Sequence, residues 1–489
     1  MAKRTKTTIT DMNGKRSLIT YAAVTAVIYI SLFVWSAEFP LFWDNPQQIG
    51  AEGNWFYANG HSTIIEPAGV GTGYHIPFLP YVTSAIWMVT GRSVVISHVL
   101  ALAAAALLIV GTWGIVKRLT SGMASAVVGL LLVTEPTVVT QFCEASPDFI
   151  MLAMLASGLS ALASGRYALT GFALLGMGLM NMRGVMAAVF LGSVMCIARY
   201  RDVGLTWRTV AKLALPSVVV FGAYYATYFA VNGWFFGESS NYSEHYAQPT
   251  SVAYVAKHVA SLILRMLEQG RIIIWAGAAW LVLRYWSEGK DWLAEHSDGR
   301  VALGFTMSQI LLFGAFAFIS QMPFGGRYFM MSHYALSLVV LSLACALFRR
   351  KATVVFFVIA ALAQVTGHAW EAFYPEKMSK PWDTTLLHTA YYGLREEVVA
   401  DIQEMNIETS DIAAGFVWGK DPLASELNAD AAYFCGPDSA RYRLLSNIDN
   451  DEDEVADSIA TYGHEIKRWR RGAINASLYD MRSVATTRK

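Results

Sequence analysis

The chain has 489 residues, of which 55% are hydrophobic and 15% are charged. Soluble proteins carry about 25% charged residues, so this composition excludes a soluble globular protein and predicts one that crosses a membrane several times. The 37 basic residues balance the 37 acidic ones and form no large cluster, so we expect no nucleic-acid partner. The four cysteines show no spacing typical of a disulfide framework or a metal site.

Residues 1–16 are polar and basic, and an apolar stretch follows at 17–36. No small-residue cleavage site comes after this stretch, so we expect a retained signal-anchor helix. Basic residues that flank a first span remain in the cytoplasm. The N-terminus is therefore predicted to be cytoplasmic, and the segment at 39–80 is predicted to lie on the opposite side of the membrane.

The 39–80 segment is too polar, and too rich in Gly and Pro, to cross a bilayer. Long loops in compact proteins are usually functional, and the aromatic residues of this one predict a position at the lipid headgroups. The segment contains Asp44, Glu52 and Glu66. Residues 79–91 are apolar but too short to span, which predicts an interfacial helix that ends at Gly91.

Helix-length apolar runs predict about eleven transmembrane helices, the first at 17–36. The others lie near 94–116, 121–135, 147–163, 168–182, 184–200, 213–231, 265–285, 301–320, 328–348 and 352–369. The run at 265–285 is the least regular because charged residues stand at its start. Clusters of Lys and Arg fall in alternate connecting loops, as expected of cytoplasmic loops. An odd number of spans places residues 370–489 outside the cytoplasm.

Residues 1–369 are thus predicted to form a transmembrane domain, and residues 370–489, which are charged and lack an apolar span, a second domain. Apolar spacing predicts helices at 390–405 and 452–463. Short strands are predicted at 411–418, 440–448 and 473–480. Helices that alternate with strands indicate a small α/β fold. The predicted fold class is an α-helical polytopic membrane protein with a small extracytoplasmic α/β domain at its C-terminus.

Several ionisable residues fall at the predicted non-cytoplasmic ends of spans, on the same side as the 39–80 segment. An ionisable group near the bilayer is costly and is therefore a functional candidate. The set consists of Glu135, Glu144, Asp148, Arg183, Arg327 and His333.

These residue types suit the transfer of a sugar from a polyprenyl phosphate. The leaving group would be a lipid phosphate, which needs cations and no general acid. Arg183 and Arg327 suit that task because a guanidinium binds phosphate at two points. The acceptor, a hydroxyl or amine, needs a base, and Asp44 suits that role because partial burial can tune a carboxylate.

The same residues also have structural interpretations. Asp44 can cap a helix at 45–58, with Pro46 in its first turn. Three others have comparable alternatives: a turn before Pro67 for Glu66, a helix N-terminal charge for Asp148, and contact with lipid headgroups for Arg183. Capping alone does not account for the acids and bases gathered near Asp44.

Several different short motifs follow one another along the chain. They are Trp43-Asp44-Asn45, Tyr57-Ala58-Asn59-Gly60, Glu66-Pro67, Gly73-Tyr74-His75-Ile76-Pro77, Gly91-Arg92, Pro136 with Pro147-Asp148, Arg183-Gly184 and Gly326-Arg327-Tyr328. Their order and spacing resemble those of the membrane glycosyltransferases with the C-type fold (GT-C), which use polyprenyl-phosphate-linked sugars. This family includes the protein O-mannosyltransferases and the aminoarabinose transferases of lipid A. The resemblance is best over the first 200 residues.

The resemblance implies a role for each matched residue. Asp44 would be the catalytic base, and the substrate-binding residues would be Glu66, His75, Asp148, Arg183, Arg327 and Tyr328, with both arginines on the donor phosphate. The chain departs from the family at two positions. Asn45 stands where many relatives have a second acid, and Pro67 stands where some have a basic residue.

The expected function is that of an integral glycosyltransferase of the plasma (inner) membrane, which moves a sugar from a polyprenyl-phosphate donor to a glycan, lipid or protein acceptor on the outer face. One base and one phosphate leaving group predict a single displacement with inversion. The sequence indicates no certain cofactor. His75 and His333 leave a divalent metal as an alternative, although one His beside one Pro is not a ligand set. The rival interpretations are a transporter or lipid-linked-sugar flippase, and a non-catalytic scaffold.

Overall fold

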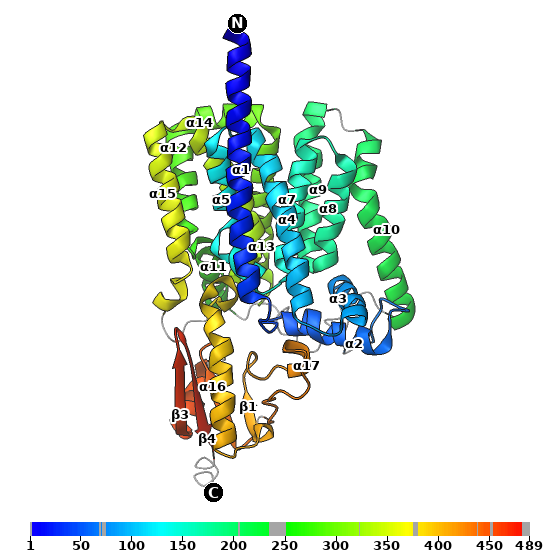
Figure 1. Ribbon diagram of the computed structural model, residues 1–489, viewed down its shortest axis with the longest axis vertical. Coiled ribbons are helices and arrows are strands. Elements are labelled where there is room, and N and C mark those ends of the chain that lie inside the picture. Colours follow the sequence, from blue (N-terminus) through cyan, green and yellow to red (C-terminus); the bar gives the residue numbers. More distant parts are fainter. Residues whose placement is uncertain are drawn as a thin grey trace.

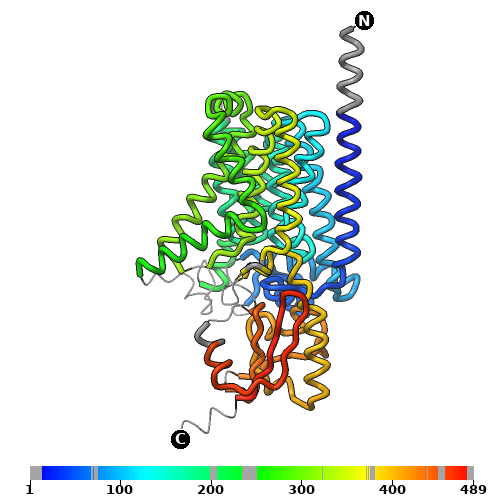
Figure 2. The backbone as a smooth tube through the Cα atoms, turned by 90° about the vertical axis from the view of Figure 1, so that its left-hand side faces the viewer, coloured from blue at the N-terminus to red at the C-terminus, as the bar shows by residue number. Residues whose placement is uncertain are grey.

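The computed structural model describes residues 2–67, 70, 75–203, 206–233, 251–321, 323–374, 380–437, 439–449 and 453–481. Figure 1 shows an elongated bundle of helices with a smaller α/β region at one end, while the first helix begins beyond the other end. Figure 2 shows the same division from the side. The predicted class, a helical membrane protein with a small C-terminal α/β region, is confirmed.

Most helices of the bundle follow the predicted apolar runs, whereas α6 and almost all of α11 lie outside them. The helices of the bundle are α1 (Ala2–Ser36), α4 (Val95–Leu119), α5 (Met123–Val133), α6 (Pro136–Cys143), α7 (Pro147–Ala163), α8 (Tyr167–Met180), α9 (Met182–Val203), α10 (Trp207–Asn232), α11 (Val252–Leu267), α12 (Ile272–Glu295), α13 (Ser297–Ile319), α14 (Met330–Leu347) and α15 (Arg350–Gly367).

The predicted number of eleven spans is not confirmed. Among the described residues six helices are long and apolar enough to cross a membrane, or up to eight if each sharply bent pair counts as one span. The difference arises from helices such as α5, α7 and α8. They lie where spans are predicted but have 11, 17 and 14 residues, and a straight crossing needs roughly 20.

Two pairs of helices are broken near the end of the bundle that carries the α/β region. The bend is 56° between α5 and α6 and 91° between α11 and α12. The start of the predicted span at 265–285 is therefore wrong, because α11 ends at Leu267 and α12 begins at Ile272. Gly270 lies in the break with φ of 81°, and a Cβ there would lie 2.2 Å from the Ala363 carbonyl oxygen. Only glycine fits this turn.

The 39–80 segment lies across that end of the bundle (Figure 1). It contains η1, a π-helical turn (Pro46–Ala51), and α2 (Glu52–Asn59), and it leads into α3 (Phe78–Thr90). The predicted interfacial helix is thus present as α3, and its C-cap is Gly91 with φ of 83°. Gly73 and Tyr74, which begin the Gly73-Tyr74-His75-Ile76-Pro77 motif, lie outside the described residues.

The C-terminal α/β region (residues 380–481) begins with the turns η6 (Trp382–Thr384) and η7 (Leu386–Thr389). Its further elements are α16 (Ala390–Glu404), η8 (Thr409–Asp411), β1 (Ile412–Ala414), α17 (Pro422–Ser425), β2 (Tyr442–Ser446), α18 (Asp453–Tyr462), β3 (His464–Arg471) and β4 (Ile474–Asp480). The strands form a sheet in the order β1-β2-β4-β3, in which β1 is parallel to β2 and the other pairs are antiparallel.

Most elements of this region follow the predictions for 390–405, 440–448, 452–463 and 473–480. The predicted strand at 411–418 ends early, at Ala414, because the chain turns there. β3 is missing from the prediction. Its sequence is mostly charged and all of its residues except Trp469 are exposed, so it lacks the alternation that marks a half-buried strand.

The 39–80 segment and the C-terminal α/β region pack directly on each other. The Leu41 amide donates to the Ser425 carbonyl at 2.8 Å, and Asn54 Nδ2 donates to the Leu423 carbonyl at 2.7 Å. Phe42 is 1% exposed and belongs to the core of the α/β region, together with Trp382 and Trp418. This packing fixes the backbone immediately before Asp44.

Candidate active site

Asp44 is presented by a tight turn. Trp43 has φ of 59°, in the left-handed region, and the Asn45 amide returns to the Phe42 carbonyl at 3.1 Å. The Asn45 side chain donates to the Glu144 carbonyl at 3.0 Å and holds the turn against the bundle. The helical turn that follows is capped at Asn45 without a side-chain hydrogen bond. The carboxylate of Asp44 instead accepts a hydrogen bond from Arg327 Nη2, so it does not serve as a helix cap.

Arg327 lies at the centre of the site, in the 3-10 turn η4 (Gly326–Phe329). Its side chain is 3% exposed. In addition to Asp44, its Nε lies 3.1 Å from Asp383 Oδ2 and 3.3 Å from Asp148 Oδ2. Arg183 Nη2 approaches the same Asp148 oxygen at 3.0 Å. The bundle, the 39–80 segment and the α/β region therefore all contribute charged groups to one cluster.

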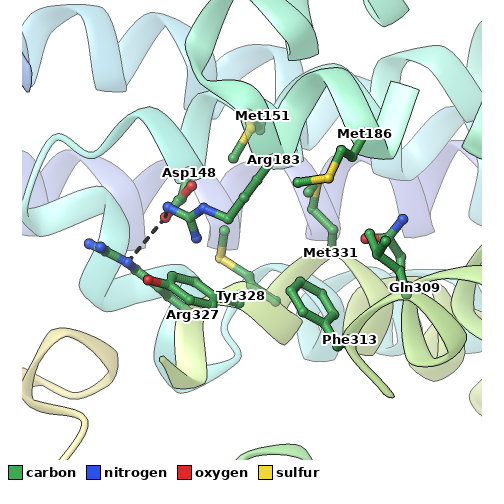
Figure 3. Close-up of a pocket in the computed structure, with 11 residues that line it drawn as sticks. Asp148, Met151, Arg183, Met186, Gln309, Phe313, Arg327, Tyr328 and Met331 are labelled. Atoms are coloured by element: carbon green, nitrogen blue, oxygen red, sulfur yellow. Dashed lines mark hydrogen bonds and ion pairs between the residues drawn. The ribbon is translucent and has the colours of Figure 1, made fainter. Parts of the chain in front are cut away.

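Tyr328 and Asn181 complete the cluster. The Arg183 guanidinium lies 4.0 Å from the centroid of the Tyr328 ring, a cation–π contact. Asn181 Nδ2 donates to Asp148 Oδ1 at 3.1 Å. Its Oδ1 accepts from the Gly184 amide at 3.0 Å. Asp148 is thereby held on both oxygens, and Figure 3 shows it facing Arg183 and Arg327.

The pKa values of two carboxyl groups in this cluster, Asp44 and Asp383, are shifted in opposite directions. Burial raises the pKa of Asp44, but Arg327 and more weakly Lys420 and Arg183 outweigh that cost and bring the pKa below its usual value. For Asp383 the balance is reversed: burial and the neighbouring Asp44 and Asp148 charges raise its pKa, and Arg327 does not compensate fully. Of these two carboxyl groups, Asp44 is therefore the more strongly held as an anion and Asp383 the more readily protonated.

His75 lies beside this cluster and binds a backbone amide at the start of α9. Its Nδ1 accepts a hydrogen bond from the Met182 amide at 3.1 Å, at the start of α9. Burial, and next the Arg183 charge, lower the pKa of His75 to about 4, so the ring is neutral at physiological pH. A neutral ring next to Arg183 avoids a second cation at that point.

Glu66 lies elsewhere, and the described structure shows no contact between it and Asp44, Asp148 or either arginine. It neighbours an apolar cluster formed by Ile65, Ile76, Tyr224 and Tyr228, against α10. The residue is 6% exposed, and within the described part of the chain its Oε2 has no hydrogen-bond partner. Burial raises the pKa of Glu66 to about 7.

This shift predicts a stability that depends on pH. Burial tolerates the neutral carboxyl and disfavours the charged one. The stability that the folded protein gains from a neutral Glu66 is therefore fully present below the unfolded pKa of about 4.5 and is lost as the pH rises through about 7. We expect Glu66→Gln to be more stable than the wild type at pH 8.5, by about 2 kcal/mol, and similar to it at pH 4.5. Thermal unfolding in detergent at both pH values measures this. Glu38→Gln, at an exposed position, is the control, and an unchanged pH dependence in Glu66→Gln would contradict the assignment.

A groove runs from the charged cluster between the helices. Asp148, Arg183, Arg327 and Tyr328 line its polar end, and the rest of its wall is mainly apolar and rich in methionine (Figure 3). The apolar lining consists of Met151, Met186, Leu312, Phe313, Met330 and Met331. About 340 Å³ of space along these residues is not filled by protein atoms, and part of it is open solvent. Two guanidiniums at the end of a flexible apolar channel suit a molecule with an anionic head and a lipid chain.

A second network lies behind Arg327 and fixes its backbone. The fully buried Arg271, from the break between α11 and α12, contacts Glu135 with Nε at 2.8 Å and the Gly326 carbonyl with Nη1 at 2.9 Å. Next to it, Arg265 Nη1 pairs with Glu268 Oε2 at 2.9 Å. Glu135 is 4% exposed, so it is an internal ion-pair partner and not the interfacial residue that its sequence position suggests.

Sequence reasoning overlooks three members of the site. Asp383 and Lys420 come from the C-terminal α/β region, beyond the last span, and no local motif marks them. Asn181 is neutral and belongs to none of the motifs, although it orients Asp148. Among the described residues no group of three or more His, Cys, Asp or Glu side chains is placed to hold a metal ion.

The fold has counterparts among solved structures. No family model matches the sequence, and no curated protein matches it. The chain is similar to ArnT from Cupriavidus metallidurans bound to undecaprenyl phosphate, with a TM-score of 0.55 and 13% identity over 94% of this chain and 97% of that one. The apo state of ArnT gives a TM-score of 0.54, with 13% identity over 95% and 98% of the two chains. The chain therefore has the GT-C fold of the membrane glycosyltransferases that its sequence motifs resemble.

Proposed function

We propose that the protein is a membrane glycosyltransferase that moves a sugar from a polyprenyl-phosphate donor to an acceptor hydroxyl or amine at the membrane surface. One observation carries the proposal: the Asp44 carboxylate meets Arg327 where the polar end of an apolar groove begins. A base and a phosphate-binding cation stand side by side there. The fold, shared with an ArnT structure that contains undecaprenyl phosphate, supports the same donor class.

Each side chain of the site has a separate role in the proposed reaction. The donor chain lies along the methionine-rich groove, and Arg183 and Arg327 bind its phosphate. The acceptor X–H attacks the anomeric carbon from the side opposite the phosphate. Asp44 takes the proton, the new bond forms from X to carbon, and the bond from carbon to the phosphate oxygen breaks. The polyprenyl phosphate leaves with the electron pair, and the arginines stabilise its growing charge. A single displacement of this kind inverts the anomeric centre.

The resting ion pair explains how the base is activated. While Arg327 holds Asp44, the low pKa of the carboxylate makes it a weak base. A donor phosphate on Arg327 would compete for the same guanidinium and add a negative charge nearby. Both effects raise the pKa of Asp44. The base is then strongest only when the donor is in place, which limits side reactions in the empty site.

The orientation of the chain in the membrane is part of the proposal. Because α1 begins at the end of the bundle opposite the site (Figure 1), a cytoplasmic N-terminus would place the site on the outer face of the plasma (inner) membrane. The C-terminal α/β region would then cover that face and meet a glycan, lipid or protein acceptor.

Asp44→Asn tests the assignment of the base. The amide keeps the size of the side chain and loses the proton-accepting charge, so we expect transfer to fall by about 10²- to 10⁴-fold while undecaprenyl phosphate still binds. Transfer is measured as the release of undecaprenyl phosphate from lipid-linked sugars in native membrane vesicles. Binding of undecaprenyl phosphate is measured by native mass spectrometry. Asp411→Asn, the same change at an exposed position, is the control. Transfer by Asp44→Asn within about threefold of the wild type would remove Asp44 from this role.

A further inference from the structure

The hairpin formed by β3 and β4 carries two exposed arginines at its tip. Arg471, the last residue of β3, pairs with Ile474, the first residue of β4, so only Gly472 and Ala473 form the turn. Gly472 has φ of 58°, the left-handed conformation that such a short turn needs. Arg470 and Arg471, called here the tip arginines, are both exposed. Two adjacent cations therefore stand at one end of the sheet.

The tip arginines lack acidic partners, unlike the other long cations of β3. Lys467 Nζ lies 2.6 Å from Asp401 Oδ2, and Arg468 Nη2 lies 2.6 Å from Glu465 Oε2. In the described part of the chain no carboxylate forms an ion pair with either tip arginine, and the hydrogen bond in which one of them takes part goes to a carbonyl group of the same hairpin. The uncompensated positive charge of the strand is therefore concentrated at its tip.

The tip lies at the end of the α/β region that faces the helical bundle. Trp382 Nε1 donates to the Asn447 carbonyl at 2.9 Å, and Asn447 Nδ2 donates to the Ala473 carbonyl at 2.9 Å. Trp382 directly precedes Asp383, which pairs with Arg327 in the active site. Figure 2 shows the hairpin in red, with its turn directed toward the bundle. Hydrogen bonds therefore connect the tip to the segment that enters the active site.

The lipid-facing helix α15 stands above the tip. Both views place the hairpin below the end of α15 (Figures 1 and 2). The side chains of Val358, Leu362 and Val365 on this helix are 52%, 60% and 71% exposed, an apolar surface that lipid acyl chains cover in a bilayer. The headgroups of those lipids form a layer just beyond the hydrocarbon core. The tip arginines thus lie on the side of the α/β region that meets the headgroups.

We propose that the tip of the β3–β4 hairpin docks on the membrane surface, where Arg470 and Arg471 bind the phosphates of anionic phospholipids next to α15. The inference needs only that the bundle lies in a bilayer, so it does not depend on the proposed reaction. A guanidinium can bind a phosphate at two points, and a surface with net negative charge attracts cations that a neutral surface does not. Through Asn447 and Trp382, the docked tip holds the α/β region against the bundle.

Labelling of the tip arginines with phenylglyoxal tests the proposal, with the full chain in lipid nanodiscs and peptide mass spectrometry giving the rate at each arginine. We expect labelling to be at least about threefold slower in discs that contain about 30% phosphatidylglycerol than in discs of phosphatidylcholine alone, because bound phosphate shields the guanidinium. Raising the NaCl concentration to about 0.5 M should remove most of this difference. Arg441, an exposed residue that pairs with Asp480 at the opposite end of the sheet, is the internal control and should be labelled equally in both.

Three outcomes would overturn the inference. The first is equal labelling of the tip arginines in the two kinds of disc. The second is protection that persists unchanged at high salt, which would show that another part of the protein covers the tip. The third is protection by inorganic phosphate in discs of phosphatidylcholine alone, at constant ionic strength. That result would assign the tip to a soluble molecule that carries phosphate, and not to the membrane surface.

Two matched double variants give a second measurement. Arg470→Gln with Arg471→Gln should lower the preference of the most tightly held lipid site for phosphatidylglycerol over phosphatidylcholine at least about fivefold, measured by native mass spectrometry from mixed micelles. Lys467→Gln with Arg468→Gln removes the same charge from the same strand, but from residues that are already paired, and should change this preference less than about twofold. Equal losses in both double variants would contradict docking at the tip, because only the net charge of the strand would then matter.

Discussion

Replacing Arg327 by Lys is expected to weaken the binding of undecaprenyl phosphate by about 30- to 200-fold, and to reduce transfer at least as much. The ammonium keeps the positive charge amid Asp44, Asp148 and Asp383, so the cluster remains balanced. It loses the planar fork that can hold a carboxylate and a phosphate together, and charge-assisted hydrogen bonds of this kind contribute about 2–3 kcal/mol. Binding is measured by native mass spectrometry in detergent micelles.

The matched control for this change is Arg118→Lys. Arg118 also pairs with an aspartate, Asp298, at 3.3 Å, but its side chain is 46% exposed and lies away from the site. That substitution should change binding by less than about twofold, because exposed ion pairs contribute little. Wild-type affinity in Arg327→Lys, with a melting temperature equal to that of the wild type, would show that Arg327 does not bind the donor phosphate.

Removing Arg271 is expected to have the largest effect on stability. Arg271→Met leaves Glu135 charged and buried and removes the donor of the Gly326 carbonyl. Breaking a buried ion pair from one side costs about 3–5 kcal/mol. Because Gly326 directly precedes Arg327, any folded fraction should also bind undecaprenyl phosphate more weakly. Unfolding in detergent, followed by intrinsic fluorescence, measures the loss of stability.

A double-mutant cycle isolates the pair. The double variant Glu135→Leu with Arg271→Met removes both buried charges, so it should be more stable than Arg271→Met alone. Arg118→Met, at the half-exposed pair with Asp298, should cost under about 1 kcal/mol. If Arg271→Met unfolds at the wild-type temperature, the network does not hold the turn that contains Arg327.

The sequence predicts local features of this protein well because they depend on neighbouring residues. The apolar runs locate nearly every bundle helix, and Gly91 marks the end of α3. The break at Gly270 is harder to predict, since it depends on the approach of the Ala363 carbonyl from a distant helix. β3 escapes prediction because its charged residues face solvent on both sides of the strand.

Some residues of the site can likewise be predicted from the sequence, and others cannot. Asp44, Asp148, Arg183, Arg327 and Tyr328 each belong to a short motif, and the structure brings all five together. Glu66 also belongs to a motif, yet the packing of Ile65 and Ile76 against α10 directs it to another cluster. Asp383 and Lys420 reach the site only through the docking of the α/β region, which no spacing along the chain reveals.

The position of Asp383 has a consequence for biosynthesis. This carboxylate contacts Arg327, but it is held by a region whose sheet is completed only by β4, near the end of the chain. A ribosome that releases the helices first delivers a bundle whose central arginine still lacks one of its acidic neighbours. A chain that is unfinished, or clipped before the last strand, would therefore sit in the membrane with an incomplete set of charged groups around Arg327.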